Sequence, residues 1–308
     1  MKGKHDYIDS LIEDFVKVVK SSKSKVPIES KWKSIKSELQ LQGYEGRTIK
    51  KVVSRIRTEV KTLDKTKAIN QNRIKWVCGF TKANGDKIKG IVVSGEEIWK
   101  PIDEESGERL QIRLDNAGNN IITNIDEFIR IATSLLTSWS YVDVAVGLAF
   151  LTGRRSIEIL ALGSFEVKDK SHVLFKGQAK KRDKDIKGYT IPVLCDSQLV
   201  VNGLKRLNGL KNFDNLTNEQ IHNSTSASLN KAVKKYFNRF AVKELTMHDL
   251  RRIYAKYCLD KFLGKDKFIK VKNDRFFLSK LLGHEHDKKG TGTETGLSYL
   301  DFTIQYNT

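Results

Sequence analysis

Residues 141–158 read YVDVAVGLAFLTGRRSIE, and the first eleven of them indicate the fold class. They are apolar on nearly every side of a helix apart from Asp143, which predicts a helix buried within a core. The stretch continues with a glycine and two arginines near the expected start of the next helix. Backbone amides and a guanidinium can both face an anion at a helix start. We therefore expect a core helix that leads directly into an anion-binding turn.

Arg154 and Arg155 both occupy this turn, and Glu158 follows three residues after Arg155. A glutamate at that spacing can hold the arginine in place. The spacing therefore favours Arg155 over Arg154 as the residue that faces the anion. An Arg–Glu pair on a helix is also typical of a purely structural contact, so this segment alone leaves both interpretations open.

Helical and strand patterns flank the core helix. Asn124 and Glu127 resemble a capping box ahead of an amphipathic segment. Apolar residues alternate in 173–175 and again in 189–193, which predicts strands, and the helical pattern returns from 197 to about 283. The sequence therefore predicts a mainly α fold with a small antiparallel β-sheet, of the α+β class.

The N-terminal part of the chain also predicts helices before its pattern changes. Apolar residues recur at helical spacing in 8–19, 32–39 and 52–63. In 74–95 alternating residues and an Asn-Gly turn predict a β-hairpin. The stretch 101–120, with a proline, acidic residues and a Gly/Asn-rich end, predicts a linker or a domain boundary.

The charge of the 308-residue chain predicts a polyanionic partner. Lys plus Arg number 56 against 37 Asp plus Glu, a net charge of +19, and cations that neutralise phosphates release counterions. Residues 1–80 hold nineteen Lys/Arg and nine Asp/Glu, whereas 101–150 hold three and eight. This swing favours a basic arm that lies on nucleic acid, the alternative being a general excess of lysine. The third helical segment concentrates the DNA-binding candidates Lys50, Lys51, Arg55 and Arg57.

Other partners and compartments are excluded by simple features. No apolar run approaches the length of a bilayer span, and the amino terminus lacks the apolar core of a signal peptide. Cys78, Cys195 and Cys258 lie far apart without CxxC spacing, so we expect reduced thiols rather than a disulfide or zinc framework. These features predict a cytoplasmic protein that does not bind membranes.

A charged run, 180–185, lies between the two strand segments. It supplies Lys180, Lys181 and Arg182 at the expected tip of a hairpin, where a lysine can reach into a groove and deliver a proton. A solvated charged turn is the alternative. Lys181 and Arg182 are further DNA-binding candidates.

The last motifs lie toward the end of the chain. His248 and Arg251 are three residues apart, which puts both side chains on one face of a helix. Leu282-Gly283-His284 follows, and then a Gly/Thr-rich stretch, 290–296, that lacks the GK[ST] ending of a phosphate loop. Tyr299 comes next, three residues before Phe302. Its separation of fifteen residues from His284 is long and leaves Tyr306 as an alternative nucleophile.

Taken in order, these residues resemble the signature of the tyrosine recombinases, and within them the telomere resolvases or protelomerases. The segments 153–159, 175–182, 251–255 and 282–302 are similar to that family's motifs. The resemblance covers roughly 125–305. It implies a tyrosine-recombinase-like catalytic domain over 116–308. Residues 1–115 would form a basic, mainly helical N-terminal region that clamps DNA, with its hairpin near 74–95.

The resemblance also implies roles for individual residues. Tyr299 would attack a backbone phosphate and leave a 3′-phosphotyrosyl bond with a free 5′-hydroxyl. Arg155 and Arg251 match the two arginines that clamp the phosphate, and Lys180 matches the lysine that protonates the leaving 5′-oxygen. His248 and His284 match positions that hydrogen-bond the phosphate and assist proton movement. Phosphotyrosine keeps the energy of the broken bond, so neither metal nor any other cofactor is implied.

The implied substrate is double-stranded DNA at a palindromic junction, bound by a homodimer and resolved into covalently closed hairpin ends. Twofold protein symmetry would match twofold DNA symmetry. Two other functions remain open: a conventional tyrosine recombinase or integrase, and a DNA-binding relative that has lost activity. Larger family members continue beyond the tyrosine into a further DNA-binding region, whereas this sequence has nine more residues.

Overall fold

The computed structural model describes residues 4–65, 69–115, 119–179, 188–283 and 301–306. The chain divides into two compact units, Met1–Gln111 and Ile112–Thr308, which we call the N-terminal and C-terminal units. Each has a hydrophobic core of its own. Among the described residues, no helix combines the length and the apolar character needed to cross a membrane.

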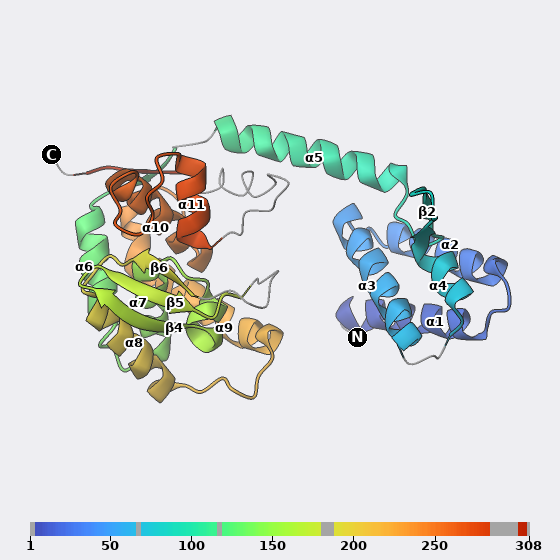
Figure 1. Ribbon diagram of the computed structural model, residues 1–308, viewed down its shortest axis with the longest axis horizontal. Helices are drawn as coiled ribbons and strands as arrows, with labels where there is room; N and C mark the ends of the chain where they lie inside the picture. Colours follow the sequence, from blue (N-terminus) through green and yellow to red (C-terminus); the bar gives the residue numbers. More distant parts are fainter. Residues whose placement is uncertain (1–3, 66–68, 116–118, 180–187, 284–300, 307–308) are drawn as a thin grey trace. The chain divides into compact units, whose positions relative to one another are not determined.

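The N-terminal unit is a group of helices with one small hairpin (Figure 1). The three helices expected from the apolar spacing are confirmed, and their inward residues, such as Phe15, Ile35 and Ile56, are fully buried. The elements are α1 (Lys4–Ser21), α2 (Lys25–Leu41), α3 (Gly46–Lys65), α4 (Gln71–Cys78), β1 (Gly79–Thr81), β2 (Lys87–Lys89) and α5 (Glu96–Asp115).

The predicted strand at 74–78 is wrong, because these residues form α4. The side chain of Asn70 caps this helix by accepting a hydrogen bond from the Asn72 amide at 2.6 Å. Ile74 and Cys78 are four residues apart, so they fit one face of a helix as well as one face of a strand. The cap at Asn70 favours the helix. The hairpin itself is confirmed in shorter form, with β1 and β2 joined across the predicted Asn-Gly turn.

Of the two predictions for 101–120, the linker is wrong over most of its length because α5 continues to Asp115, whereas the domain boundary is confirmed. Glu96 and Glu97 lie in its first turn, where carboxylates stabilise the positive end of the helix dipole. Pro101 lies inside the helix. The division between the two units falls within this helix, between Gln111 and Ile112.

The core of the C-terminal unit is α7 (Tyr141–Thr152), the helix expected from the apolar stretch. Its residues 144–152 are all buried. The helix packs against α6 (Ile125–Leu135), α8 (Ser197–Leu210), α9 (Asn218–Phe237) and α10 (Met247–Phe262) (Figure 1). Phe128 of α6 stacks on Phe237 of α9 with ring centroids 4.0 Å apart. The predicted cap of α6 is also present, since the Asn124 side chain accepts from the Glu127 amide.

A small antiparallel sheet lies beside these helices, as predicted. It has the order β4 (Ser164–Asp169), β5 (His172–Lys176), β6 (Tyr189–Pro192). A second, parallel pairing was not expected: β3 (Asn120–Ile122) pairs with β7 (Phe302–Ile304), and paired residues are 182 positions apart. A π-helical turn, Glu158–Leu162, precedes β4, and α11 (Asp274–Leu282) is the last helix described. The mainly α fold with small sheets is confirmed.

Candidate functional site

A pocket of about 420 Å³ in the C-terminal unit brings together three of the predicted site residues, Arg155, His248 and Arg251. Its walls come from the turn after α7, from α9 and from the start of α10. The other lining residues include Ser156, Ile157, Leu160, Asn218, His222, Thr225, Ser226, Asn230, Thr246 and Met247. Cations on one wall and polar groups on the other suit a phosphate with its flanking nucleotides.

The turn after α7 depends on a glycine. Gly153 caps the helix with φ 65°, in the left-handed region that favours glycine. A Cβ atom at this position would lie 2.1 Å from the ring of Tyr254. Tyr254 is fully buried and donates a hydrogen bond to the Pro192 carbonyl, so it is a core residue rather than a nucleophile. The turn therefore lies directly on a fixed aromatic ring.

The two arginines of the turn have different environments. Arg154 is 1% exposed and donates to the carbonyls of Thr152 and Leu281, at 3.1 and 2.8 Å, and to the Tyr189 hydroxyl. Arg155 retains 22% of its side-chain exposure and donates from Nη1 to Glu158 Oε1 at 2.7 Å. The donors of Arg154 are thus used inside the protein, whereas Arg155 lies at the pocket with one carboxylate behind it.

Glu158 organises the wall of the pocket. Its carboxylate is fully buried and accepts hydrogen bonds from the Arg155 amide at 3.0 Å and from the Ala179 amide at 3.1 Å, besides the Arg155 guanidinium. Burial alone would raise the pKa of this carboxyl, but Arg154, Arg251 and Arg155 together outweigh it and lower the pKa below 4.5. The group is therefore ionised near neutral pH and fixes the guanidinium of Arg155.

The helix α10 presents His248 and Arg251 from its first turns. A capping box between Thr246 and Asp249 starts the helix. Arg251 is 1% exposed and donates from Nη1 to the Gly153 carbonyl and from Nη2 to the Leu282 carbonyl at 3.0 Å. Arg251 therefore joins the end of α7 to the end of α11.

His248 is exposed on one side and lies among cations on the other. Partial burial lowers its pKa below 6.5, and the charges of Arg252 and Arg251 lower it further. A neutral imidazole at pH 7 follows, which has one nitrogen able to accept a proton.

Five predicted residues lie outside the described ranges: Lys180, Lys181, Arg182, His284 and Tyr299. The described residues just before Lys180 and His284 are held near Glu158, in the wall of the pocket. Gln178 donates from Nε2 to the Gly283 carbonyl, and the Ala179 amide donates to Glu158. The segments that lead into Lys180 and His284 thus begin beside each other.

The segment that follows Tyr299 is also tied to this unit. The Asn120 side chain donates to the Asp301 carbonyl at 3.0 Å, and Arg252 Nη1 lies 3.6 Å from Asp301 Oδ2. Phe302 is buried in the parallel pairing with β3. The residue two positions after Tyr299 is therefore anchored to α10, the helix that carries His248 and Arg251.

The alternative nucleophile, Tyr306, has another partner. Its hydroxyl donates to Asp260 Oδ2 at 3.1 Å. Burial and the Asp260 charge raise its pKa, so its phenolate form is disfavoured near neutral pH.

The sequence interpretation missed the polar wall that α9 contributes. Asn218, His222, Ser226 and Asn230 recur at intervals of four and line the pocket. Asn230 accepts a hydrogen bond from the Met247 amide at 2.9 Å, which orients the start of α10. The four-residue interval was the available signal, since it marks one face of a helix.

The candidates proposed on α3 do not form one free cationic patch. Lys50 lies 3.5 Å over the ring of Trp99, Arg55 pairs with Asp9 at 2.6 Å, and Arg57 donates to the Cys78 carbonyl at 2.5 Å. Lys51 is exposed. Three of the four thus have partners within the N-terminal unit, because a helix that packs on two neighbours presents cations to each of them.

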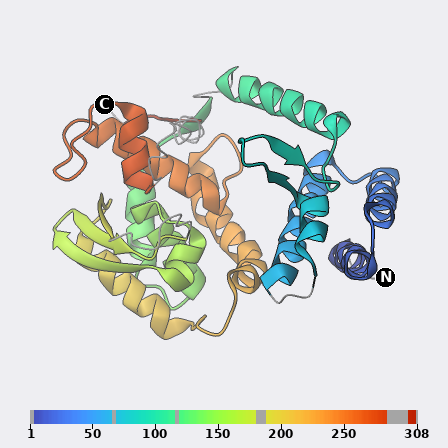
Figure 2. The same cartoon turned by 45° about the vertical axis from the view of Figure 1, so that its right-hand side comes forward.

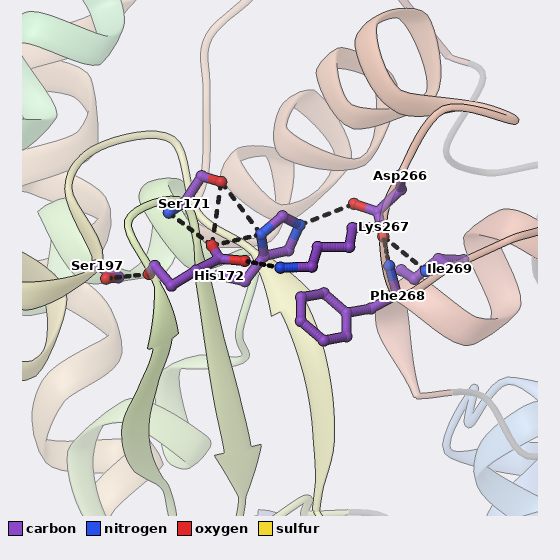
Figure 3. Close-up of polar contacts among 8 residues, drawn as sticks. Ser171, His172, Ser197, Asp266, Lys267, Phe268 and Ile269 are labelled. Atoms are coloured by element: carbon purple, nitrogen blue, oxygen red, sulfur yellow. Dashed lines mark hydrogen bonds and ion pairs between the residues drawn. The ribbon is translucent and has the colours of Figure 1, made fainter.

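A buried polar cluster joins the β4–β5 turn to the loop that precedes α11. The His172 ring lies between two carboxylates, with Nδ1 2.8 Å from Asp169 Oδ1 and Nε2 3.1 Å from Asp266 Oδ2. Asp266 also accepts from the amides of Phe268 and Ile269 (Figure 3). The cluster fixes the loop between α10 and α11 on the turn between β4 and β5. In the part of the chain that the structure describes, no group of three or more His, Cys, Asp or Glu is placed to hold a metal ion.

Comparison with known proteins gives one matching family model, described as the telomere resolvase ResT/TelK catalytic domain, over residues 119–302. Telomere resolvase ResT of Borreliella burgdorferi is 29% identical over 164 residues, which cover 53% of this chain and 35% of that protein. A protelomerase of Yersinia phage PY54 is 35% identical over 176 residues, covering 54% and 27%. The chain therefore spans about a third of the length of these relatives.

Solved structures show the same fold over nearly the whole chain. A protelomerase TelA covalently complexed with substrate DNA superposes with a TM-score of 0.74 at 21% identity, covering 99% of this chain and 90% of that one. Protelomerase TelK complexed with substrate DNA gives a TM-score of 0.59 at 21% identity, covering 98% and 58%.

Proposed function

This chain belongs to the telomere resolvase ResT/TelK catalytic-domain family, and from that premise we propose that it breaks and rejoins DNA strands to form hairpin telomeres. The observation that carries the proposal is the pocket in which Arg155, His248 and Arg251 meet. Their side chains come from two elements almost 100 residues apart. A structural role for the pair of Arg155 and Glu158 does not require that convergence.

The proposed reaction begins with Tyr299. Its hydroxyl oxygen attacks a backbone phosphorus and the bond from phosphorus to the 5′-oxygen breaks, leaving a 3′-phosphotyrosine and a 5′-hydroxyl. Free tyrosine has a pKa of about 10, so its proton needs an acceptor. His248 is a suitable acceptor because its ring is neutral near pH 7 and has one nitrogen without a proton.

The cations act on the charge that develops. Arg155 and Arg251 neutralise the negative charge on the pentavalent phosphorus, as positioned donors do in phosphoryl transfer. Arg155 has its guanidinium fixed by Glu158, and Arg251 by two backbone carbonyls. Such positioning lowers the reorganisation needed during the reaction. Lys180 protonates the leaving 5′-oxygen, and His284 hydrogen-bonds the phosphate.

The second step decides the product. The 5′-hydroxyl of the complementary strand attacks the phosphotyrosine, the bond from phosphorus to the tyrosine oxygen breaks, and Tyr299 is released. When both strands rejoin in this way, each end of the duplex closes as a hairpin. We propose a homodimer on a palindromic junction, because two cuts related by a twofold axis need two tyrosines. The relatives come from a bacterium and a phage, which supports action on DNA in a bacterial cytoplasm.

One experiment tests this proposal against its alternatives. The protein is incubated with a palindromic duplex junction, and the products are separated on a denaturing gel. Snap-back hairpins that migrate as single strands of twice the half-site length support telomere resolution. Recombinant duplexes formed between two substrates would instead identify a conventional recombinase. Absence of any covalent protein–DNA adduct would leave only a DNA-binding role.

A further inference from the structure

We propose that the β1–β2 hairpin of the N-terminal unit is a DNA-reading element that enters the major groove of the duplex. The inference rests on the proposed function in that the partner is DNA, but it assigns a contact surface that lies outside the pocket. It adds the cations of the hairpin to the exposed Lys51 of α3.

The hairpin is exposed and positively charged. Residues 80–89 are all exposed. Lys82, Lys87 and Lys89 project from them, and no ion pair of theirs is found among the described residues. Asp86 is the one carboxylate of this stretch, and it accepts from the side-chain amide of Asn84 at 2.8 Å within the turn. The three cations are therefore available to phosphates.

The shape of the hairpin fits the major groove of DNA. The hairpin is a two-stranded ribbon with the pairs Gly79–Lys89, Phe80–Ile88 and Thr81–Lys87. The major groove of B-DNA is about 12 Å wide and admits a two-stranded β-ribbon. Phe80 and Ile88 share one face of the ribbon and remain 41% and 38% exposed. Apolar side chains on such a face can contact thymine methyl groups. Lys87 and Lys89 alternate with Ile88 and lie on the opposite face, from which their long side chains can reach phosphates along the groove.

Hydrogen bonds to neighbouring helices hold the hairpin rigid. The Ile91 amide donates to the Trp76 carbonyl at 2.7 Å, and Arg57 of α3 donates to the Cys78 carbonyl, so both strands are fixed to helices at the base of the hairpin. Figure 2 shows the ribbon of the hairpin in teal. Gly79, with φ 77°, allows close approach, since a Cβ atom there would lie 2.2 Å from the Ile88 carbonyl oxygen. A fixed ribbon loses little conformational entropy when it binds. Arg57, one of the DNA-binding candidates, thus acts by holding the hairpin.

Binding of the full-length chain to a fluorescein-labelled mixed-sequence duplex, followed by anisotropy over a salt series, tests the inference. The variant Lys82→Ala/Lys87→Ala/Lys89→Ala is expected to weaken binding about tenfold or more and to reduce the salt slope by about two to three. The control Lys20→Ala/Lys23→Ala/Lys25→Ala removes the same charge from exposed positions at the end of α1, in the α1–α2 connection and at the start of α2. Equal losses in both variants would overturn the inference, because bulk charge would then explain the binding. Circular dichroism melts verify that both variants fold.

A second duplex carries glucosylated 5-hydroxymethylcytosine, which fills the major groove without changing the charge of the DNA. The wild type is expected to bind it more weakly than the unmodified duplex, whereas the hairpin variant is expected to discriminate little. A wild type that is indifferent to glucosylation would refute groove entry. These readouts need no cleavage. Failure to form a covalent adduct therefore refutes the proposed function alone, and unchanged binding by the hairpin variant refutes this inference alone.

Discussion

Glu158→Gln is the substitution for which the structure gives the sharpest expectation. The carboxylate is fully buried and surrounded by three arginines, of which Arg155 bonds it directly. Glutamine keeps the volume but removes the charge, and its amide group places donors against donors. Breaking a buried pair costs about 3–5 kcal/mol when one partner is removed, so we expect about 3 kcal/mol for this near-isosteric change. In a unit of roughly 200 residues, that is a fall in melting temperature of about 6–12 °C.

The stability lost on Glu158→Gln should also depend on pH. The folded-state pKa of Glu158 is lowered below 4.5, so its stabilising contribution is present above the unfolded-state pKa. The contribution disappears as the pH falls through the folded-state pKa. The stability difference between wild type and Glu158→Gln should therefore be full at pH 7.5 and shrink on acidification below about pH 4.5.

Urea unfolding of both proteins, followed by circular dichroism at pH 7.5 and in acid, measures this difference. Glu127→Gln is the matched control, because it also removes a carboxylate paired with an arginine, in this case on the surface with Arg130. The control is expected to lose much less stability than Glu158→Gln, because surface ion pairs and first-turn carboxylates contribute little. A Glu158→Gln protein as stable as the wild type at pH 7.5 would show that the buried carboxylate does not hold the arginines, and the account of the pocket would fail.

Three further outcomes are expected. Tyr299→Phe should bind DNA without forming a covalent adduct on a denaturing gel, whereas Tyr306→Phe should form the adduct; the reverse pattern would transfer the nucleophile to Tyr306. Gly153→Ala should lose at least about 1 kcal/mol in urea unfolding because its φ is positive and Tyr254 blocks the added methyl, whereas Gly209→Ala, in open space on α8, should not be destabilised. The lowered pKa of His248 destabilises the fold only as the pH falls below its unfolded value of 6.5. Thermal melts of His248→Gln should therefore match the wild type at pH 7.5 and exceed it at pH 5.5; a parallel decline of both proteins would contradict the lowered pKa.

Much of the fold follows from local pattern. The stretch 141–151 is apolar on all sides, and such a helix has no stable place except inside a core. The three N-terminal helices, the strands β5 and β6 and the helices after residue 197 follow equally from spacing. The errors fall where two periods fit the same residues. In 74–78 the cap at Asn70 favours the helix. Residues 101–115 continue a helix whose first turn carries Glu96 and Glu97, despite Pro101.

The site divides in the same way between sequence and structure. Motif order predicted which residues belong to one site, and the structure brings Arg155, His248 and Arg251 to one pocket. Only the tertiary structure distinguished the two arginines of the turn: both line the pocket, but the donors of Arg154 are used by the Leu281 carbonyl and the Tyr189 hydroxyl, which lie far away in sequence, whereas Arg155 remains partly exposed.

Contacts between distant segments also decided what the cations of the N-terminal unit do. On α3 a run of lysines and arginines predicted a DNA-binding face, but Asp9, Trp99 and the Cys78 carbonyl take up three of those side chains. A sequence determines how many charges a helix carries and on which side. Whether a charge remains free for a partner depends on which other segments pack against that side, and only the folded chain determines that.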